Sequence, residues 1–390
     1  MRVLVAHNYY RSAIPSGENR VVDLEIGALR AAGHDVVTYL RSSDEIPGMA
    51  PAEKVRAAVS PVSSPRAAAD VRHLLAESPV DVMHLHNPYP LISLDVVRAA
   101  RAAGVPVVQT VHNHRHTCMK GTYQREGHDC RDCLTHRSPW PGVHHACYRD
   151  SRAQSAVMAA ALLRHRSTYQ LIDRFIALTP EIEASLLASG FPASRITIKP
   201  NSVPDPGPAS SLGEGFAFVG RLSEEKGVLA LIEAWSRFEP GSLGRLRIAG
   251  DGPARDEVDR LAASRPDIDV LGRVEPDAVA DLLATSAALA VPSLWAEALP
   301  LVVLEALAAG RALLVTDMGG LPGVVDDEVG LVVPPSVDGL ADGLVALARD
   351  REGLTRRGAA ARARYLTRYH PSVVTESLVA VYTAARNERS

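Results

Sequence analysis

Two charged segments in the second half of the chain have the residue types needed to bind an anionic ligand rich in hydroxyl groups. The first runs from Gly220 to Gly227 and contains Arg221 and Lys226. We expect this turn to follow a strand and to open a helix, where free backbone N–H groups add to the two cations and suit a diphosphate. A solvated turn with two surface charges would have the same composition, and spacing alone does not separate these interpretations.

The second segment runs from Ser293 to Glu305. A strand is expected to end near its start, and Pro300 is well placed as the first residue of a helix. Glu297 would then lie on the loop at the carboxyl end of the strand, with Glu305 further along the helix. A carboxylate in the apolar run 301–309 is costly to bury unless it is paired or bound to a ligand, and sugar hydroxyls are good partners for it. The alternative, an exposed glutamate on the outer helix face, is disfavoured by the neighbouring leucines.

Three histidines stand at the ends of expected strands in the first half. His112 follows the strand 105–111, while His84 and His86 fall at the end of the strand 81–85. Ligands of parallel sheets bind at the carboxyl ends of the strands, so we expect His112 to face a binding site. A spacing of two puts His84 and His86 on one face, where they could line an acceptor site or be structural.

All four cysteines lie close together, as Cys118-x11-Cys130-x2-Cys133-x13-Cys147. The surrounding stretch 112–150 is rich in Arg, His, Gly and Pro and has little apolar content for a core of its own. In a reducing compartment, a C-x2-C pair with two further cysteines suits a tetrahedral structural zinc site, whose four thiolates leave no open position for catalysis. Four free thiols and a disulfide pair are the alternatives.

Short apolar runs alternate with helical segments in both halves, which indicates an α/β fold with parallel sheets covered on both faces. A chain of 390 residues exceeds what one core usually supports. The Pro-rich segment 200–208 can continue neither a helix nor a strand, so it is the expected linker. We predict two doubly wound, Rossmann-like domains facing across a cleft, 1–202 (with the insertion 112–150) and 203–370, and a final helix 371–390 that packs back on the first.

The strands expected in the first domain are 3–6, 36–40, 81–85, 105–111, 174–178 and 196–199. Those expected in the second are 216–219, 245–249, 268–271, 287–291, 312–315 and 330–333. Helices are expected between them, and three more should close the chain.

Composition excludes several classes of protein. The formal net charge is −3, which gives no electrostatic reason to expect a nucleic acid as partner. The apolar start of the chain is too short for a secretory signal, and no stretch approaches the roughly 18 apolar residues of a membrane span. We therefore expect a cytoplasmic protein with reduced thiols.

The charged motifs resemble those of the retaining glycosyltransferases of family 4, which have the GT-B fold. The shared features are the Gly-Arg…Glu-Lys-Gly turn at 220–227 and a pair of glutamates, Glu297 and Glu305, with seven residues between them. Three shorter motifs extend the resemblance along the whole chain: Pro200-Asn201, Gly250-Asp251-Gly252-Pro253 and Gly319-Gly320-Leu321-Pro322. A bacterial subset of the family carries a similar Cys-bearing insertion in the N-terminal domain.

The resemblance implies roles for individual residues. Arg221 and Lys226 would hold the donor diphosphate, Glu305 the ribose and Glu297 the donor sugar. In the family, a histidine at the position of His112 lies near the anomeric centre. With Arg221, Lys226 and Glu297 it forms the expected catalytic set.

Further donor contacts are implied for loops and backbone groups, at Gly17, Glu18, Gly220, Arg273, Val274, Ala298, Leu299, Pro300 and Leu301. The loop before Gly17 departs from the family pattern, because Ser16 stands where many relatives have glycine. Gly323 is a second departure, since relatives often carry glutamate there.

The expected activity is transfer of a sugar from a nucleoside-diphosphate sugar to a hydroxyl acceptor. UDP is the commonest donor nucleotide, and a glycan, a lipid-linked saccharide or a natural-product scaffold could be the acceptor. Catalysis should need no cofactor, and the zinc would be structural. Because many relatives act on lipid-linked acceptors, peripheral contact with the inner face of a membrane is a further expectation.

Three other functions fit parts of the sequence. A sugar-nucleotide epimerase or phosphorolytic enzyme on the same fold would need no acceptor alcohol. A non-catalytic nucleotide-sugar-binding protein would never release nucleoside diphosphate. A zinc-dependent hydrolase centred on the insertion would need an open metal site.

Overall fold

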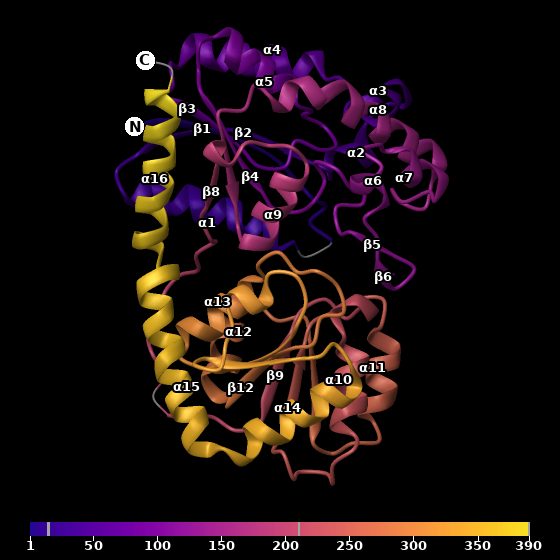
Figure 1. The fold of residues 1–390 in the computed structure, drawn as a ribbon, viewed down its shortest axis with the longest axis vertical. Helices are drawn as coiled ribbons and strands as arrows, with labels where there is room; N and C mark the ends of the chain where they lie inside the picture. Colours follow the sequence, from indigo (N-terminus) through magenta and orange to yellow (C-terminus); the bar gives the residue numbers. More distant parts are fainter. Residues whose placement is uncertain (14–15, 210, 389–390) are drawn as a thin grey trace. The chain divides into compact units, whose positions relative to one another are not determined.

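The computed structural model describes residues 1–13, 16–209 and 211–388, which form two compact units (Figure 1). Unit 1 comprises Met1–Pro200 and Val374–Ser390, and unit 2 comprises Asn201–Val373. The division falls within the predicted linker 200–208. The last helix, α16 (Pro371–Asn387), begins in unit 2 and enters unit 1.

Unit 1 contains a six-stranded parallel sheet in the order β2-β1-β3-β4-β7-β8. Its strands are β1 (Arg2–Tyr9), β2 (Asp35–Ser42), β3 (Val82–Leu85), β4 (Val107–Val111), β7 (Arg174–Ala177) and β8 (Ile196–Ile198). All residues of β3 and β4 are buried, as expected for apolar strands that are covered on both faces. Each of these strands coincides with a predicted one apart from a few residues at its ends.

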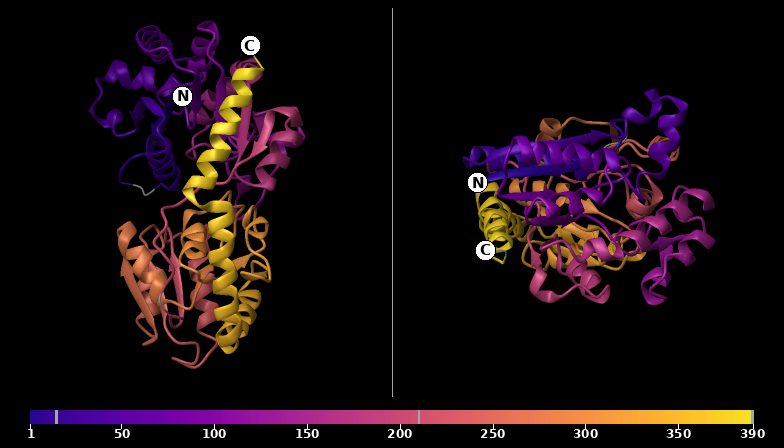
Figure 2. Two further views of the ribbon diagram at one scale, coloured as in Figure 1. Left: turned by 90° about the vertical axis from the view of Figure 1, so that its left-hand side faces the viewer. Right: turned by 90° about the horizontal axis from the view of Figure 1, so that it is seen from above.

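Helices cover the sheet on both faces (Figure 2). On one face, α1 (Gly17–Ala31) and α16 share a core with the strands, to which Ile26 and Tyr382 contribute. Ser16 caps α1, because its hydroxyl accepts a hydrogen bond from the backbone N–H of Asn19 at 3.3 Å. A second group contains α4 (Pro65–Glu77), α5 (Asp95–Ala102) and α8 (Arg152–Tyr169), which pack in series, while α9 (Pro180–Ala188) lies against β7 and β8.

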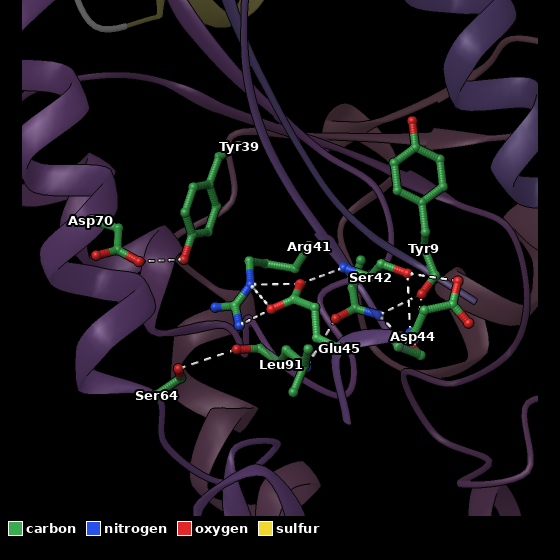
Figure 3. Close-up of polar contacts among 11 residues, drawn as sticks. Tyr9, Tyr39, Arg41, Ser42, Asp44, Glu45, Ser64, Asp70 and Leu91 are labelled. Carbon is green, nitrogen blue, oxygen red and sulfur yellow. Dashed lines mark hydrogen bonds and ion pairs between the residues drawn. The ribbon is translucent and has the colours of Figure 1, made fainter. Parts of the chain in front are cut away.

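Polar contacts hold the chain where it leaves β2 (Figure 3). Arg41 forms a two-pronged ion pair with Glu45, whose carboxylate also accepts a hydrogen bond from the backbone N–H of Ser42 at 2.8 Å. The hydroxyl of Tyr39 donates to Asp70 of α4 at 2.9 Å. These bonds direct the chain into the short helices α2 (Glu45–Gly48) and α3 (Pro51–Val59), for which no element was predicted.

The insertion contains a two-stranded hairpin, β5 (Gln124–Arg125) and β6 (His128–Asp129), followed by α6 (Asp132–Thr135) and α7 (Trp140–His144). Met119 packs with Met158 and Leu162 of α8 in a small core. Ser185 of α9 lies 3.0 Å from the Tyr123 hydroxyl, 3.0 Å from His114 Nδ1 and 3.2 Å from His116 Nε2. The insertion is therefore anchored on α8 and α9, which the sequence did not predict.

Unit 2 contains a second six-stranded parallel sheet, in the order β11-β10-β9-β12-β13-β14. Its strands are β9 (Phe216–Val219), β10 (Leu246–Ala249), β11 (Ile268–Gly272), β12 (Ala288–Val291), β13 (Ala312–Thr316) and β14 (Gly330–Val333). The helices α10 (Val228–Trp235), α11 (Arg255–Ala262) and α14 (Val337–Arg349) share the main core with the strands. The helices α12 (Pro276–Thr285), α13 (Leu301–Ala308) and α15 (Arg351–Arg364) form the remaining layer.

The fold prediction is confirmed, since both units are doubly wound parallel α/β structures. Two boundaries differ for identifiable reasons. The predicted helix 225–237 is split at Gly227, whose φ of 71° separates a 3₁₀ turn (Glu224–Lys226) from α10. The predicted helix 353–368 begins earlier, in α15, where Asp350 caps it, and continues as a π-helical turn, Tyr365–Tyr369.

Candidate functional site

The two charged motifs of unit 2 meet at the carboxyl ends of β9 and β12. These strands are neighbours in the sheet, and the strand order reverses between them, which is where ligands bind in such sheets. The backbone N–H of Leu294 donates to the carbonyl of Glu225 at 2.9 Å and ties the two loops together. Segments far apart in the sequence thus form one site, as their strand-end positions predicted.

Glu297 is the centre of this site and is only 7% exposed. Its Oε1 accepts hydrogen bonds from Lys226 Nζ at 2.6 Å, from the Ser293 hydroxyl at 2.6 Å and from the indole N–H of Trp295 at 2.9 Å. All three bonds end on the same oxygen. Within the described ranges, Oε2 has no protein partner, so it is available to a ligand.

The electrostatics keep Glu297 ionised. Burial alone would raise the pKa of its carboxyl, but the Lys226 ammonium and the hydrogen bonds from Ser293 and Trp295 bring that pKa below its usual value. Lys226 also lies over the Trp295 ring, with Nζ 5.2 Å from the centroid. Its side chain stays 24% exposed, so the ammonium can reach a second anion beside Glu297.

Glycines from two other motifs support these loops. A Cβ on Gly319, which has a φ of 59°, would lie 2.4 Å from the carbonyl oxygen of Glu297, and Gly320 donates its N–H to that oxygen at 2.7 Å. A Cβ on Gly250 would lie 1.8 Å from the carbonyl oxygen of Gly220. Only glycine permits these approaches, which explains the Gly-rich motifs in physical terms.

The other donor-site predictions for unit 2 lie around this centre. Arg221 is exposed and has no hydrogen bond or ion pair among the residues that the structure describes. Glu305 is half-buried on α13. Ala298, Leu299, Pro300 and Leu301 lead into the N-terminus of α13, which has no side-chain cap, while Arg273 and Val274 follow β11, two strands from β9 in the sheet.

Unit 1 has a pocket of its own at the end of β4. His112 and His86 both line it, together with polar side chains such as Asn87, Gln109 and Asn113. The two imidazoles are hydrogen-bonded, with His86 Nδ1 2.9 Å from His112 Nε2. The prediction that His112 faces a binding site therefore agrees with its position in a pocket.

His84 has the surroundings of the structural alternative that the sequence left open. Its ring is fully buried, with Nδ1 2.6 Å from the Tyr382 hydroxyl and Nε2 2.8 Å from the Thr110 hydroxyl. His84 lies within β3 and contacts Tyr382 of α16, whereas His86 follows the end of the strand and lines the pocket. We therefore assign His84 no contact with an acceptor.

Two residues that the sequence analysis missed lie beneath His84 and His86. Glu25 of α1 and Lys199, which follows β8, form a buried ion pair of 2.7 Å. The other oxygen of Glu25 lies 3.0 Å from His84 Nδ1 and 3.2 Å from His86 Nε2, without the alignment of a regular hydrogen bond. The sequence contains one signal for this pair, which is the position of Glu25 on the apolar face of an amphipathic helix.

Gly17 and Glu18 open α1 and lie in unit 1. Glu18 lines the same pocket as His112 and accepts a hydrogen bond from the Tyr10 hydroxyl at 3.3 Å. Arg115 donates in turn to Tyr10 at 3.3 Å. Glu18, which was predicted to contact the donor, therefore supplies a carboxylate to the unit 1 pocket.

The four cysteines of the insertion line a second pocket, with Met119 and Gly142. All are half-buried free thiols. Burial, together with the neighbouring cysteines, raises the pKa of Cys133 to about 11. The insertion thus brings Cys118, Cys130, Cys133 and Cys147 to one place.

Two family models match the chain. A glycosyl transferase 4-like domain matches residues 16–202, and a model of glycosyl transferases group 1 matches residues 213–350. The first covers most of unit 1 and the second most of unit 2.

Relatives align with both units. The chain is 28% identical to a glycogen synthase of Mycobacterium tuberculosis, over 100% of this chain and 96% of that protein. It is 27% identical to a phosphatidyl-myo-inositol mannosyltransferase of Mycobacterium leprae, over 82% of this chain and 77% of that protein.

Solved structures share the fold at low identity. The HepE protein of Anabaena, solved in complex with UDP, superposes with a TM-score of 0.68 at 15% identity, over 98% of this chain and all of that one. A sucrose-phosphate synthase of Thermosynechococcus elongatus gives a TM-score of 0.71 at 17% identity, over 99% of each chain.

Together, the paired parallel-sheet units, the strand-end site and these matches define a glycosyltransferase with the GT-B fold. More particularly, the chain belongs to family 4 of these enzymes, as its motifs predicted. It acts in sugar transfer from a nucleotide-sugar donor. In the described part of the chain, no helix is long and apolar enough to cross a membrane.

Proposed function

We propose that this enzyme transfers a sugar from a UDP-sugar to a hydroxyl acceptor with retention of anomeric configuration. The observation that carries the proposal is the geometry of Glu297, whose Oε1 is held by three donors while Oε2 is left for a ligand. The HepE structures contain UDP and, in one case, UDP-glucose, which supports uridine as the base.

The donor diphosphate would bind beside Lys226 and Arg221. As the bond between the anomeric carbon and the phosphate oxygen breaks, negative charge grows on the departing diphosphate, and these two cations stabilise it without a divalent metal. Glu297 Oε2 would accept a hydrogen bond from a hydroxyl of the sugar, and backbone N–H groups before α13 would donate to other sugar oxygens. Glu305 would accept from the ribose.

The acceptor hydroxyl would attack on the same face that the diphosphate leaves. The new bond forms between the acceptor oxygen and the anomeric carbon, and the acceptor proton passes to the departing phosphate oxygen. The pocket of unit 1 suits a hydroxyl-bearing molecule, because His112 and Asn113 are among the polar residues that line it. We propose that His112 positions the transferred sugar.

The direct test is a screen of nucleoside-diphosphate sugars in which nucleoside diphosphate release is measured with and without pools of acceptor alcohols. We expect UDP release that depends on the acceptor. Glu297→Gln should lower kcat/KM by roughly a hundredfold or more, because its carboxamide cannot keep both the Lys226 contact and a pure acceptor for the sugar. Glu233→Gln, an exposed glutamate of α10, is the matched control and should keep the wild-type rate.

Other outcomes of the same screen identify the competing functions. An epimerase would convert the donor without an acceptor. A non-catalytic sensor would shift in thermal stability with donor yet never release UDP. Either result would overturn the proposed transfer.

We also propose that the four cysteines bind a structural zinc ion in the reducing cytoplasm. Their thiols line one pocket, and a cluster of thiolates is unfavourable unless a cation balances the charge. The insertion has only a small apolar core, so metal binding would add the stability that it lacks.

Zinc binding would require the cysteine side chains to draw together. In the described residues, the one group of three or more potential ligands within 4.8 Å of one another is Glu25, His84 and His86. The sulfur atoms therefore stand further apart than in a closed tetrahedral site, where Zn–S bonds are about 2.3 Å. Rotation of side chains on the short loops would close the site.

Metal analysis of the purified protein tests this proposal. We expect about one zinc ion per chain, and a Cys130→Ser/Cys133→Ser variant should lose it. His128→Ala, in the exposed hairpin of the same insertion, should keep it. Wild-type protein that contains no zinc after purification in zinc-containing buffer would contradict the proposal.

We further propose that unit 1 contacts an anionic membrane surface. Val55 and Val59 of α3, Trp140 of α7 and Leu163 of α8 are exposed, and α8 contacts both other helices. Exposed cations such as Lys54 and Arg56 accompany them.

Flotation with phosphatidylglycerol vesicles should recover the protein at low salt. A Trp140→Ser/Leu163→Ser variant should bind at least about fivefold less, and Leu271→Ser, an exposed leucine of unit 2, should bind normally. Equal binding of all three proteins would contradict this surface.

A further inference from the structure

A continuous line of buried polar contacts runs beneath the unit 1 pocket, from Lys199 to His112. Lys199 Nζ donates to Glu25 Oε2 at 2.7 Å. The second oxygen of Glu25 lies 3.2 Å from His86 Nε2, and His86 Nδ1 lies 2.9 Å from His112 Nε2. Lys199 and His86 are 2% and 1% exposed, so water does not compete for these contacts.

The chemistry of each atom determines where the protons are. The contact between Glu25 and His86 lacks the alignment of a regular hydrogen bond, but a lone pair on His86 Nε2 would face the lone pairs of the carboxylate oxygen, so electrostatics favour a hydrogen on that nitrogen. In a neutral imidazole the other nitrogen, Nδ1, is then an acceptor. His112 Nε2 must therefore donate to it, which leaves His112 Nδ1 without a hydrogen.

Charge balance disfavours a second cation among these buried groups. Lys199 and Glu25 already form a neutral pair, so a protonated histidine would be an extra charge in a buried cluster. Burial lowers the pKa of His84 to about 4, and burial with the nearby His86 and His7 places the pKa of His112 well below its usual value.

A metal ion is a weaker explanation for the same cluster. Glu25, His84 and His86 have ligand atoms within 4.8 Å of one another. The Lys199 ammonium, however, already supplies a cation at 2.7 Å from Glu25, and the Tyr382 hydroxyl lies 2.6 Å from His84 Nδ1. A divalent ion would have to bind beside this fixed positive charge.

We propose that Glu25, Lys199 and His86 are positioning residues that hold His112 in its Nε2–H tautomer. The inference rests on the proposed role of His112 at the sugar. Nδ1 of His112, which has no protein partner among the residues described, then accepts a hydrogen bond from a substrate hydroxyl. His112 thus selects a hydroxyl donor at that point and rejects a substrate oxygen that has no hydrogen.

The wild-type protein gives the first test, through two-bond ¹H–¹⁵N correlation spectra of ¹⁵N-histidine-labelled enzyme. The His112 signals are assigned by comparison with His112→Gln. We expect the nitrogen shifts of a neutral ring protonated at Nε2, between pH 7 and 8. A ring protonated at Nδ1, or an imidazolium, overturns the proposal without any variant having to fold.

Glu25→Gln gives the second test, because it should move the ring hydrogens of His86 and His112 to the opposite nitrogens. Lys199 can only donate, so the amide oxygen should face it, and the amide N–H group then faces His86. His86 Nε2 becomes an acceptor, Nδ1 becomes a donor, and His112 is driven to its Nδ1–H tautomer. Asp23→Asn, an exposed carboxylate on the same helix, is the matched control and should leave the His112 signals unchanged.

Kinetics link the tautomer to function. Glu25→Gln should lower kcat roughly tenfold to a hundredfold, the range seen when a residue that orients a working histidine is lost, while KM for the donor stays within about twofold. A folded Glu25→Gln enzyme with a reversed tautomer and full kcat would overturn the positioning role. If instead His112→Gln is fully active while wild-type His112 is protonated at Nε2, the proton order stands and the proposed role of His112 fails.

Discussion

In the described part of the chain, each unit contains one lysine–glutamate ion pair, and the two lysines differ in their access to solvent. Lys199–Glu25 in unit 1 and Lys226–Glu297 in unit 2 are 2.7 Å and 2.6 Å long. The side chain of Lys199 is 2% exposed, whereas that of Lys226 is 24% exposed. A sealed pair can act only on its protein neighbours, while an open pair can share its charges with a ligand.

The groups around the two pairs differ as well. Thirteen of the fourteen histidines belong to unit 1, and the single histidine of unit 2 is His370. Glu25 contacts two imidazoles, a class of side chain whose unperturbed pKa lies near neutral pH. Glu297 instead accepts from an ammonium, a hydroxyl and an indole, which keep their protons throughout that range. The sealed pair should therefore control stability and proton position, and the open pair turnover.

The largest expected effect is on stability, from Lys199→Met. Removal of the ammonium leaves the Glu25 carboxylate buried and unpaired, which should lower the free energy of unfolding by about 3–5 kcal/mol. Lys54→Met, at an exposed site, should cost less than about 1 kcal/mol. Lys226→Met should cost less than Lys199→Met, because the Glu297 carboxylate keeps its hydrogen bonds from Ser293 and Trp295. Chemical denaturation followed by circular dichroism measures all three.

A double variant separates lost pairing from lost packing. Replacement of both partners, in Lys199→Met with Glu25→Leu, removes the unpaired charge and should recover much of the stability. A double variant as unstable as Lys199→Met alone would show that the carboxylate is not the source of the cost.

The open pair should show its effect in turnover. Lys226→Met should raise the barrier by about 3 kcal/mol, or roughly a hundredfold in kcat, because one cation at the leaving diphosphate is lost. Arg237→Met, which removes a surface ion pair with Asp338 in the same unit, should keep the wild-type rate. Near-normal turnover of Lys226→Met would show that the Lys226–Glu297 pair does not contribute to catalysis through its lysine.

The two pairs also differ in how far the sequence predicts them. Lys226 and Glu297 stand in strand-end motifs, and the doubly wound topology brings such ends together, so their proximity followed from the pattern. Glu25 belongs to an amphipathic helix, and Lys199 stands at a strand end that has no recognisable motif. The two residues are 174 positions apart in the sequence. No local pattern encodes that pairing, because it depends on how α1 lies across the sheet. For the same reason, period-two spacing placed His84 and His86 on one face but could not tell which ring lies under Tyr382.

We expect the buried histidines to make the stability of unit 1 depend on pH below about 6.5. The pKa of His84 is lowered from 6.5 to about 4 and that of His7 to about 3, in both cases chiefly by burial. The unfolded chain therefore binds these protons first as pH falls below about 6.5, which favours unfolding. A shift of the size seen at His84 removes up to about 3 kcal/mol between pH 6.5 and 4.

The Glu297 carboxyl, whose pKa is lowered, should cost unit 2 stability only at more acidic pH, below the ordinary carboxyl range. Hydrogen exchange measured by mass spectrometry at pH 7.5 and 5.5, corrected for intrinsic rates, should show loss of protection in unit 1 peptides alone. Equal loss in peptides of both units would contradict the assignment of the pH dependence to the histidines.

The smallest expected effect is that of Tyr382→Phe in the sealed cluster, compared with Tyr365→Phe in unit 2. The Tyr382 hydroxyl lies 2.6 Å from His84 Nδ1, and the Tyr365 hydroxyl donates to the carbonyl of Val203 at 2.9 Å. Without the Tyr382 hydroxyl, His84 Nδ1 still lies 3.0 Å from Glu25 and Nε2 still lies 2.8 Å from the Thr110 hydroxyl, so neither nitrogen is left alone. The carbonyl of Val203 has no such alternative. We therefore expect a loss of about 0.5 kcal/mol for Tyr382→Phe and about 1–2 kcal/mol for Tyr365→Phe.

In spectra of Tyr382→Phe, the nitrogen shifts should change at His84 and stay constant at His112. A larger loss for Tyr382→Phe than for Tyr365→Phe would mean that Glu25 and Thr110 do not satisfy the His84 ring.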